Sequence, residues 1–147
     1  MNAPRVATPR YVVVARTTAK GIGELEAKST TVRFDRSWNP AEPSDLPGPG
    51  ELLASAFAAC LIKNVERFGQ VLDFDYRRAE VTVELHRIDA PPRFERLEYV
   101  LRIDTSEPER RVELLHRNLK KHGTVFNTLA ATCDVTGTVI AWQSDHE

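Results

Sequence analysis

Two cysteines, Cys60 and Cys133, carry the side chains in this sequence best suited to covalent chemistry. A thiolate is a strong nucleophile, and a nearby cation or a helix N-terminus favours its formation. The two residues lie far apart in the sequence and form neither a disulfide framework nor a Cys-x-x-Cys redox or zinc pattern. We therefore expect two free thiols in a reducing compartment.

Cys60 ends a run of small residues inside the most apolar segment of the chain. Between Leu52 and Ile62 the one polar residue is Ser55, and this pattern predicts a helix from Pro49 or Glu51 to Gly69. A helix that is apolar on every side is predicted to be buried. The small side chains leave room around Cys60, although a buried cysteine is also commonly an inert packing residue.

The elements that would position this helix are mostly strands. Alternating and β-branched residues predict strands before and after it, Pro91-Pro92 predicts a turn, and the capping-box spacing of Ser106 to Glu109 predicts a second, amphipathic helix that ends at Gly123. Because strands and helices do not alternate regularly, the fold class is α+β in a single domain, residues 1–147. The predicted strands lie in segments 11–15, 24–33, 74–88, 93–103 and 133–142, with an irregular proline-rich loop at 38–49 and a short helical turn within 124–132.

The segment from Pro49 through Glu51 to Cys60, Pro-Gly-Glu-Leu-Leu-Ala-Ser-Ala-Phe-Ala-Ala-Cys, resembles the helix signature of the OsmC/Ohr family. The order of the predicted elements is similar to that family over nearly the whole chain. The resemblance implies an intertwined homodimer, in which antiparallel sheets from both chains enclose the central helices. That assembly would cover a helix that is apolar on every side.

The resemblance also implies a chemistry for Cys60. In the peroxidase branches of the family, the helix cysteine attacks an organic or fatty-acid hydroperoxide, an arginine and a glutamate hold it as a thiolate, and a second cysteine resolves the sulfenic acid. Glu51 is the glutamate implied here. Arg33 is the arginine that we favour, and Arg16 and Lys20 are the other candidate cations.

This chain departs from the family pattern at two positions. The segment that corresponds to the resolving Cys-Pro-Val is Gly123-Thr124-Val125, so that Gly123 replaces the resolving cysteine. The glutamate of the best-characterised branches stands ten residues before the cysteine, where this chain has Gly50, whereas Glu51 matches a broader set of relatives. Cys133 falls in a predicted strand, where alternation with Val135 favours packing in the core.

These observations lead to one favoured function and two alternatives. The first is reduction of organic or fatty-acid hydroperoxides through Cys60 with an external thiol reductant, with Phe57 and Trp38 lining an apolar site for the substrate or serving as ordinary core. The second is a non-catalytic dimer that binds a small apolar ligand at the subunit interface. The third is thiol-based sensing through oxidation of Cys60.

Composition argues against several other classes of function. The formal net charge of −1 comes from scattered charges, so neither nucleic acid nor a membrane surface is an expected partner. No apolar run approaches the length of a membrane span, and the first ten residues lack an apolar signal core, so a cytoplasmic location is expected. No histidine has metal-ligand spacing, and we expect neither a metal nor a cofactor.

Overall fold

A computed structural model describes residues 8–39, 41 and 44–145 of the chain. The chain forms two compact units, residues 1–49 and residues 50–147. Two prolines of the predicted irregular loop, Pro40 and Pro43, lie outside the described residues. The expectation of a single domain stays a prediction.

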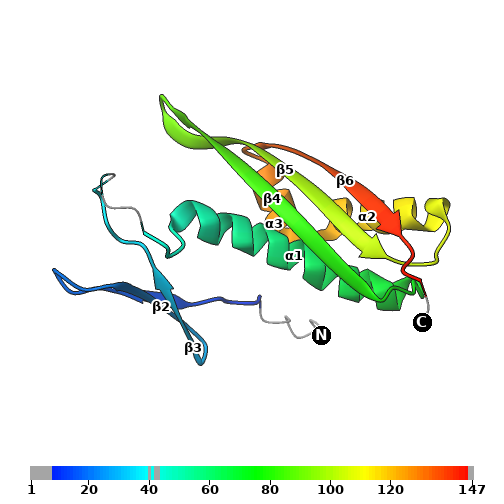
Figure 1. The fold of residues 1–147 in the computed structure, drawn as a ribbon, viewed down its shortest axis with the longest axis horizontal. Helices are drawn as coiled ribbons and strands as arrows, with labels where there is room; N and C mark the ends of the chain where they lie inside the picture. Colours follow the sequence, from blue (N-terminus) through cyan, green and yellow to red (C-terminus); the bar gives the residue numbers. More distant parts are fainter. Residues whose placement is uncertain (1–7, 40, 42–43, 146–147) are drawn as a thin grey trace, which may run out of the picture. The chain divides into compact units, whose positions relative to one another are not determined.

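The first unit is an antiparallel sheet of three strands in the order β1-β2-β3. Its strands are β1 (Val13–Arg16), β2 (Gly23–Ala27) and β3 (Thr30–Phe34), so the predicted strands in this region are confirmed. The turn between β2 and β3 places Lys28 in the left-handed region, at φ 54°. Figure 1 draws this sheet in blue.

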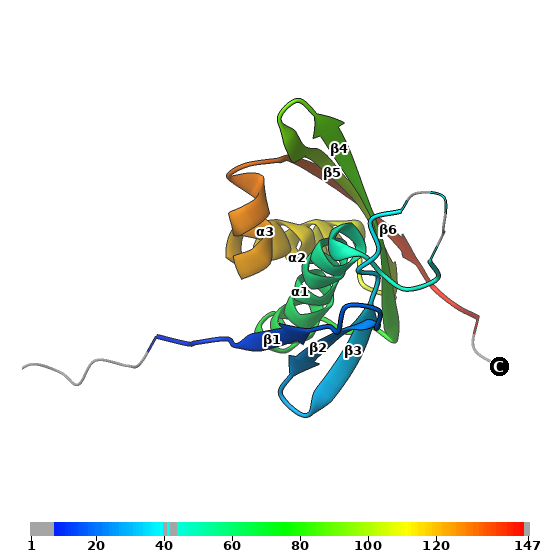
Figure 2. The same ribbon diagram turned by 90° about the vertical axis from the view of Figure 1, so that its left-hand side faces the viewer.

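The second unit is one sheet with helices on one face. Its elements in chain order are α1 (Pro49–Val71), β4 (Arg78–Asp89), β5 (Pro92–Asp104), α2 (Glu109–His122), α3 (Thr124–Ala130) and β6 (Asp134–Trp142). β4 and β5 pair antiparallel, whereas β6 pairs with β5 in parallel, because α2 and α3 carry the chain back between them. Figures 1 and 2 show the three helices on the same face of this sheet. The predicted α+β class is thereby confirmed.

Helix α1 continues past the predicted stop at Gly69 and ends at Val71. The reversal that follows is made at Asp73, which adopts a left-handed φ of 51°. Gly69 serves a different purpose, because a Cβ atom there would lie 3.2 Å from the ring of Tyr76. The glycine thus permits close packing of the segment after the helix, and the prediction of its end at Gly69 was wrong by two residues.

One stripe of α1 lies in the core of the second unit. Phe57, Leu61, Val65 and Phe68 are buried at helical spacing, and they pack with Leu97, Leu101 and other residues of β5, α2 and α3. Other positions of the helix are half-buried or exposed in the single chain. Burial of the helix on every side therefore stays a prediction that depends on the homodimer. Among the described residues, no helix combines the length and apolar character that a membrane span requires.

The predicted capping box at the start of α2 is not formed, and this prediction was wrong. The residue that caps the helix is Pro108, which makes no side-chain bond to the first turn. The Glu107 carboxylate instead accepts a hydrogen bond from the backbone N–H of Asp75, at 3.0 Å, and one from the Arg111 guanidinium, at 3.1 Å. The capping-box spacing placed Ser106 at the cap and Glu109 three positions later, whereas the helix begins only at Glu109.

A buried polar pair joins β5 to α2 beside this core. The Tyr99 hydroxyl and His116 Nε2 are 2.7 Å apart, and we assign the hydroxyl as donor to a neutral imidazole. Burial raises the pKa of Tyr99 to about 12. Burial also lowers the pKa of His116 below its ordinary value, and the positive charge of Lys120 lowers it further.

Replacement of His116 by glutamine is expected to flatten the pH dependence of stability on the acidic side. Below about pH 6.5 the unfolded chain takes up a proton at this residue before the folded chain does, so stability falls as the pH falls toward the lowered pKa. Urea unfolding at pH 7.5 and pH 5.5 measures this. The free energy of unfolding should fall more for the natural chain than for His116→Gln, and equal losses would contradict the assignment.

Candidate functional site

The Cys60 thiol lies half-buried on α1, between the helix and the junction of α2 with α3. Its polar neighbour among the described residues is Asn64, one helical turn further along. Asn64 Nδ2 donates to the Cys60 carbonyl oxygen at 2.9 Å and lies 3.5 Å from Cys60 Sγ. The sulfur therefore has a hydrogen-bond donor fixed on its own helix.

Gly123, at the junction of α2 and α3, faces this thiol. A Cβ atom built on Gly123 would lie 3.5 Å from Cys60 Sγ, 2.9 Å from the Phe126 Cβ and 3.1 Å from the Leu119 carbonyl oxygen. Its backbone, at φ −73° and ψ 118°, is open to any residue type. A side chain at position 123 would therefore lie next to the sulfur, but it would fit only if Phe126 shifted, because the buried glycine is closely packed.

Phe57, one turn before Cys60, is fully buried in the core of the second unit. Its ring centroid lies 5.6 Å from that of Tyr99 and 5.4 Å from that of Phe126. These contacts are those of an ordinary core residue. A role for Phe57 in substrate binding stays a prediction.

Glu51 occupies the first turn of α1, where its charge is favoured by the free backbone N–H groups and the helix dipole. It stands nine positions before Cys60 in the sequence. On a helix this spacing rotates two side chains by roughly 180° and separates them by roughly 13 Å along the axis. Any influence of Glu51 on the thiol of its own helix must therefore run through another residue.

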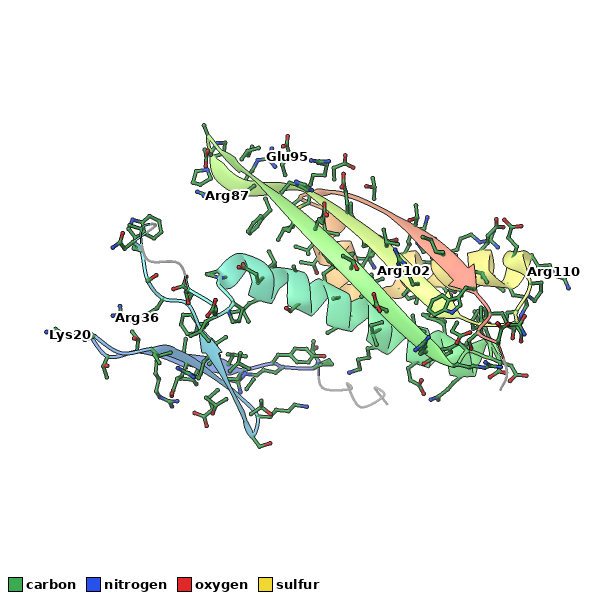
Figure 3. All side chains as sticks on the ribbon, in the orientation of Figure 1. Lys20, Arg36, Arg87, Glu95, Arg102 and Arg110 are labelled. Carbon is green, nitrogen blue, oxygen red and sulfur yellow. The ribbon has the colours of Figure 1, made fainter. Side chains whose placement is uncertain are left out.

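The candidate cations and Trp38 belong to the first unit. Arg16 Nη1 is bound to Glu26 Oε2 at 2.6 Å across β1 and β2, and Arg33 lies on β3 opposite Glu24. Lys20 lies at the turn between β1 and β2, where Figure 3 labels it. Trp38 is 96% exposed. The choice among the three cations stays a prediction, as does substrate binding by Trp38.

Cys133 has surroundings of its own. It stands one residue before β6, and its half-buried thiol donates to the Phe94 carbonyl oxygen at 3.4 Å. The Cys133 sulfur contacts Thr132 and Phe94, whereas the Cys60 sulfur contacts Asn64. These contacts are those of a residue packed at the end of a strand.

His86 lies between two glutamates on the sheet face opposite the helices, an arrangement that sequence spacing did not reveal. Its Nε2 atom is 3.6 Å from Glu84 Oε2 and 3.7 Å from Glu98 Oε2. Arg96 also binds Glu98. The arginine supplies a positive charge beside the two carboxylates, and this ion pair accounts for part of the group.

Comparison with known proteins identifies the family of this chain. The family model described as OsmC, OsmC-like protein, matches residues 41–137. The chain belongs to the OsmC family. The match includes α1, Cys60 and Gly123, so that the helix resemblance and the substitution at position 123 both lie inside the region that defines the family. No curated protein sequence matches the chain.

Solved OsmC-family structures share the fold at low sequence identity. An OsmC-like protein from Mycoplasma pneumoniae superposes with a TM-score of 0.81 at 15% identity, over 92% of this chain and 99% of that one. An organic hydroperoxide resistance protein OsmC from Legionella pneumophila gives 0.70 at 16% identity, over 91% and 98%. The organic hydroperoxide resistance protein OhrB of Bacillus subtilis gives 0.64 at 17% identity, over 91% and 100%.

Proposed function

We propose that this OsmC-family protein reduces organic or fatty-acid hydroperoxides through Cys60, with an external thiol as reductant. The observation that carries the proposal is the setting of the Cys60 sulfur, which has the Asn64 amide on one side and Gly123, a residue without a side chain, on another. A relative from Legionella and one from Bacillus are both described as organic hydroperoxide resistance proteins, which supports this substrate class.

The first step is nucleophilic attack by the Cys60 thiolate on the outer oxygen of ROOH. The sulfur gains that oxygen, the O–O bond breaks, and the alkoxide leaves and takes up a proton as ROH. Sulfur is oxidised to sulfenic acid while the peroxide is reduced. The step needs a thiolate and a route to the sulfur, and a half-buried thiol meets the second need.

The second stage needs a thiol that the chain does not supply at position 123. A small thiol R′SH attacks the sulfenic sulfur, so that Cys60–S–S–R′ forms and water leaves. A second R′SH attacks this mixed disulfide, releases R′SSR′ and restores the Cys60 thiol. Cys60 is partly exposed, and an external thiol would approach it from the exposed side.

The remaining roles follow the family resemblance. Arg33, or else Arg16 or Lys20, would supply the cation beside the thiolate of a homodimer, and Glu51 would orient that cation. Phe57 and Trp38 would contact the apolar part of the hydroperoxide. In this arrangement Glu51 acts on the thiol through the cation, which agrees with its separation from Cys60 along α1.

Consumption of cumene hydroperoxide in the presence of a dithiol reductant tests the proposal. Cys60→Ser should lower the rate by at least ~100-fold, because a hydroxyl at this position is not ionised and cannot form a sulfenic acid. Cys133→Ser should keep the rate within about twofold, since that thiol lies outside the reaction. An unchanged rate in Cys60→Ser, or no consumption by the natural chain, would refute the function.

A further inference from the structure

Asn64 lies outside the helix signature and has no role in the steps of the proposed cycle, yet it is the polar side chain next to the Cys60 sulfur among the described residues. It stands four positions after Cys60, so the two side chains project from the same face of α1. Its own side chain is half-buried. The contact is thus built into a single helix and needs no other element to form.

The two contacts of Asn64 use the two hydrogens of one amide nitrogen. One N–H is anchored to the Cys60 carbonyl oxygen at 2.9 Å, and the second is available to Sγ at 3.5 Å. The backbone anchor holds the amide in place, so the second N–H stays directed at the sulfur. A donor held in this way also restricts the rotation of the cysteine side chain.

A second asparagine in the same unit shows which of the two contacts is common to helical asparagines. Asn118, on α2, donates to the Leu114 carbonyl oxygen at 2.9 Å, with the same spacing of four residues. The backbone bond is therefore a local habit of asparagine in a helix. The contact with sulfur is particular to Asn64, because the residue four positions before it is a cysteine.

We propose that Asn64 is the positioning residue of the Cys60 thiolate. A hydrogen bond from an N–H group strengthens when its acceptor carries charge, so the amide stabilises the thiolate over the thiol. It also holds the sulfur in one orientation for the reactions with the peroxide and then with the external thiol. The inference rests on the proposed function for its catalytic meaning, but its effect on the thiolate can be measured without any peroxide.

The test is the rate of alkylation of Cys60 by iodoacetamide between pH 5 and pH 10, in a Cys133→Ser background that leaves one thiol. Asn64→Leu should move the pH of half-maximal alkylation upward, with a rate at pH 7 that is roughly 3- to 10-fold lower. Asn64→Asp, which places a carboxylate beside the sulfur, should move it further in the same direction. Asn118→Leu is the matched control and should leave the profile unchanged.

Two results would overturn the inference. One is a profile of Asn64→Leu and Asn64→Asp that superposes on the parent, and the other is an equal displacement in Asn118→Leu, which would indicate a general effect on the fold. Peroxide consumption separates this inference from the function. If the profile moves as expected while the parent consumes no peroxide, the function fails and the role of Asn64 at the thiolate stands. If the parent consumes peroxide and the Asn64 variants match it in both assays, the function stands and the role of Asn64 fails.

Discussion

Gly123→Cys is expected to give an intramolecular disulfide with Cys60 as soon as the protein meets one equivalent of hydroperoxide. The Cβ atom at this position would lie 3.5 Å from Cys60 Sγ, and a sulfur on it can reach the S–S bonding distance of about 2.05 Å. The backbone angles allow a cysteine, but Phe126, whose Cβ would lie 2.9 Å from the new Cβ, must shift, and the Leu119 carbonyl must move by a few tenths of an ångström. Closure of so long a loop should stabilise the oxidised protein by about 2–4 kcal/mol.

Thiol counting and electrophoresis without reductant measure this outcome in a Cys133→Ser background. Both thiols should disappear together in Gly123→Cys, and dithiothreitol should restore them. Thr124→Cys is the control, because residue 124 is exposed and the glycine beside the sulfur is kept. If both thiols of Gly123→Cys persist after the hydroperoxide, position 123 is not the place from which a resolving cysteine acts.

Gly137→Ala is expected to destabilise the second unit by about 3 kcal/mol, which is a large share of the stability of a small domain. Gly137 on β6 is paired with Tyr99 on β5, and a Cβ there would lie 2.2 Å from atoms of the Tyr99 ring. The ring would have to leave its place against Phe57 and its hydrogen bond with His116. Urea unfolding of the variant and of the natural chain measures the loss.

Two comparisons make this prediction specific. Gly50→Ala places its Cβ 3.5 Å from the Phe94 ring, an ordinary contact, and should change stability by less than about 1 kcal/mol. In a Tyr99→Leu background, which removes the ring, Gly137→Ala should cost much less than it does alone. Equal costs with and without the Tyr99 ring would show that the ring is not the cause.

The parts of the fold that the sequence predicted are those set by local patterns. The apolar run around Cys60 indicated α1, alternation indicated β4, β5 and β6, and Gly123 was correctly predicted to end α2. These signals lie within a few residues of the element that they define. The family resemblance added the proposed reactive role of Cys60, since composition alone favoured an inert thiol.

The parts that the sequence did not predict depend on contacts between distant segments. Ser106 and Glu109 were expected to form a capping box, but Pro108 caps α2 and makes no side-chain hydrogen bond to it. The adjacent Glu107 carboxylate accepts a hydrogen bond from the backbone of Asp75, which is distant in the sequence. The parallel pairing of β5 with β6 follows from the path of α2 and α3, which no local pattern encodes. The distance between Gly123 and the Cys60 sulfur depends on the packing of three helices.

The contact between Asn64 and Cys60, in contrast, could have been predicted from the sequence. An asparagine four residues after a helical cysteine lies on the same face and can reach the cysteine carbonyl. The chemical interest of that spacing appears only when the sulfur itself is considered as the acceptor.

The central claim, that Cys60 is a peroxide-reducing thiol without an internal resolver, is tested most directly by mass spectrometry of the natural chain. The protein is treated with one equivalent of cumene hydroperoxide, and the sulfenic acid is trapped with dimedone. We expect one dimedone adduct on Cys60, an unmodified Cys133 and no intramolecular disulfide, with cumyl alcohol formed in equal amount. A Cys60 that remains a plain thiol while the hydroperoxide is intact, or a disulfide between Cys60 and Cys133, would contradict it.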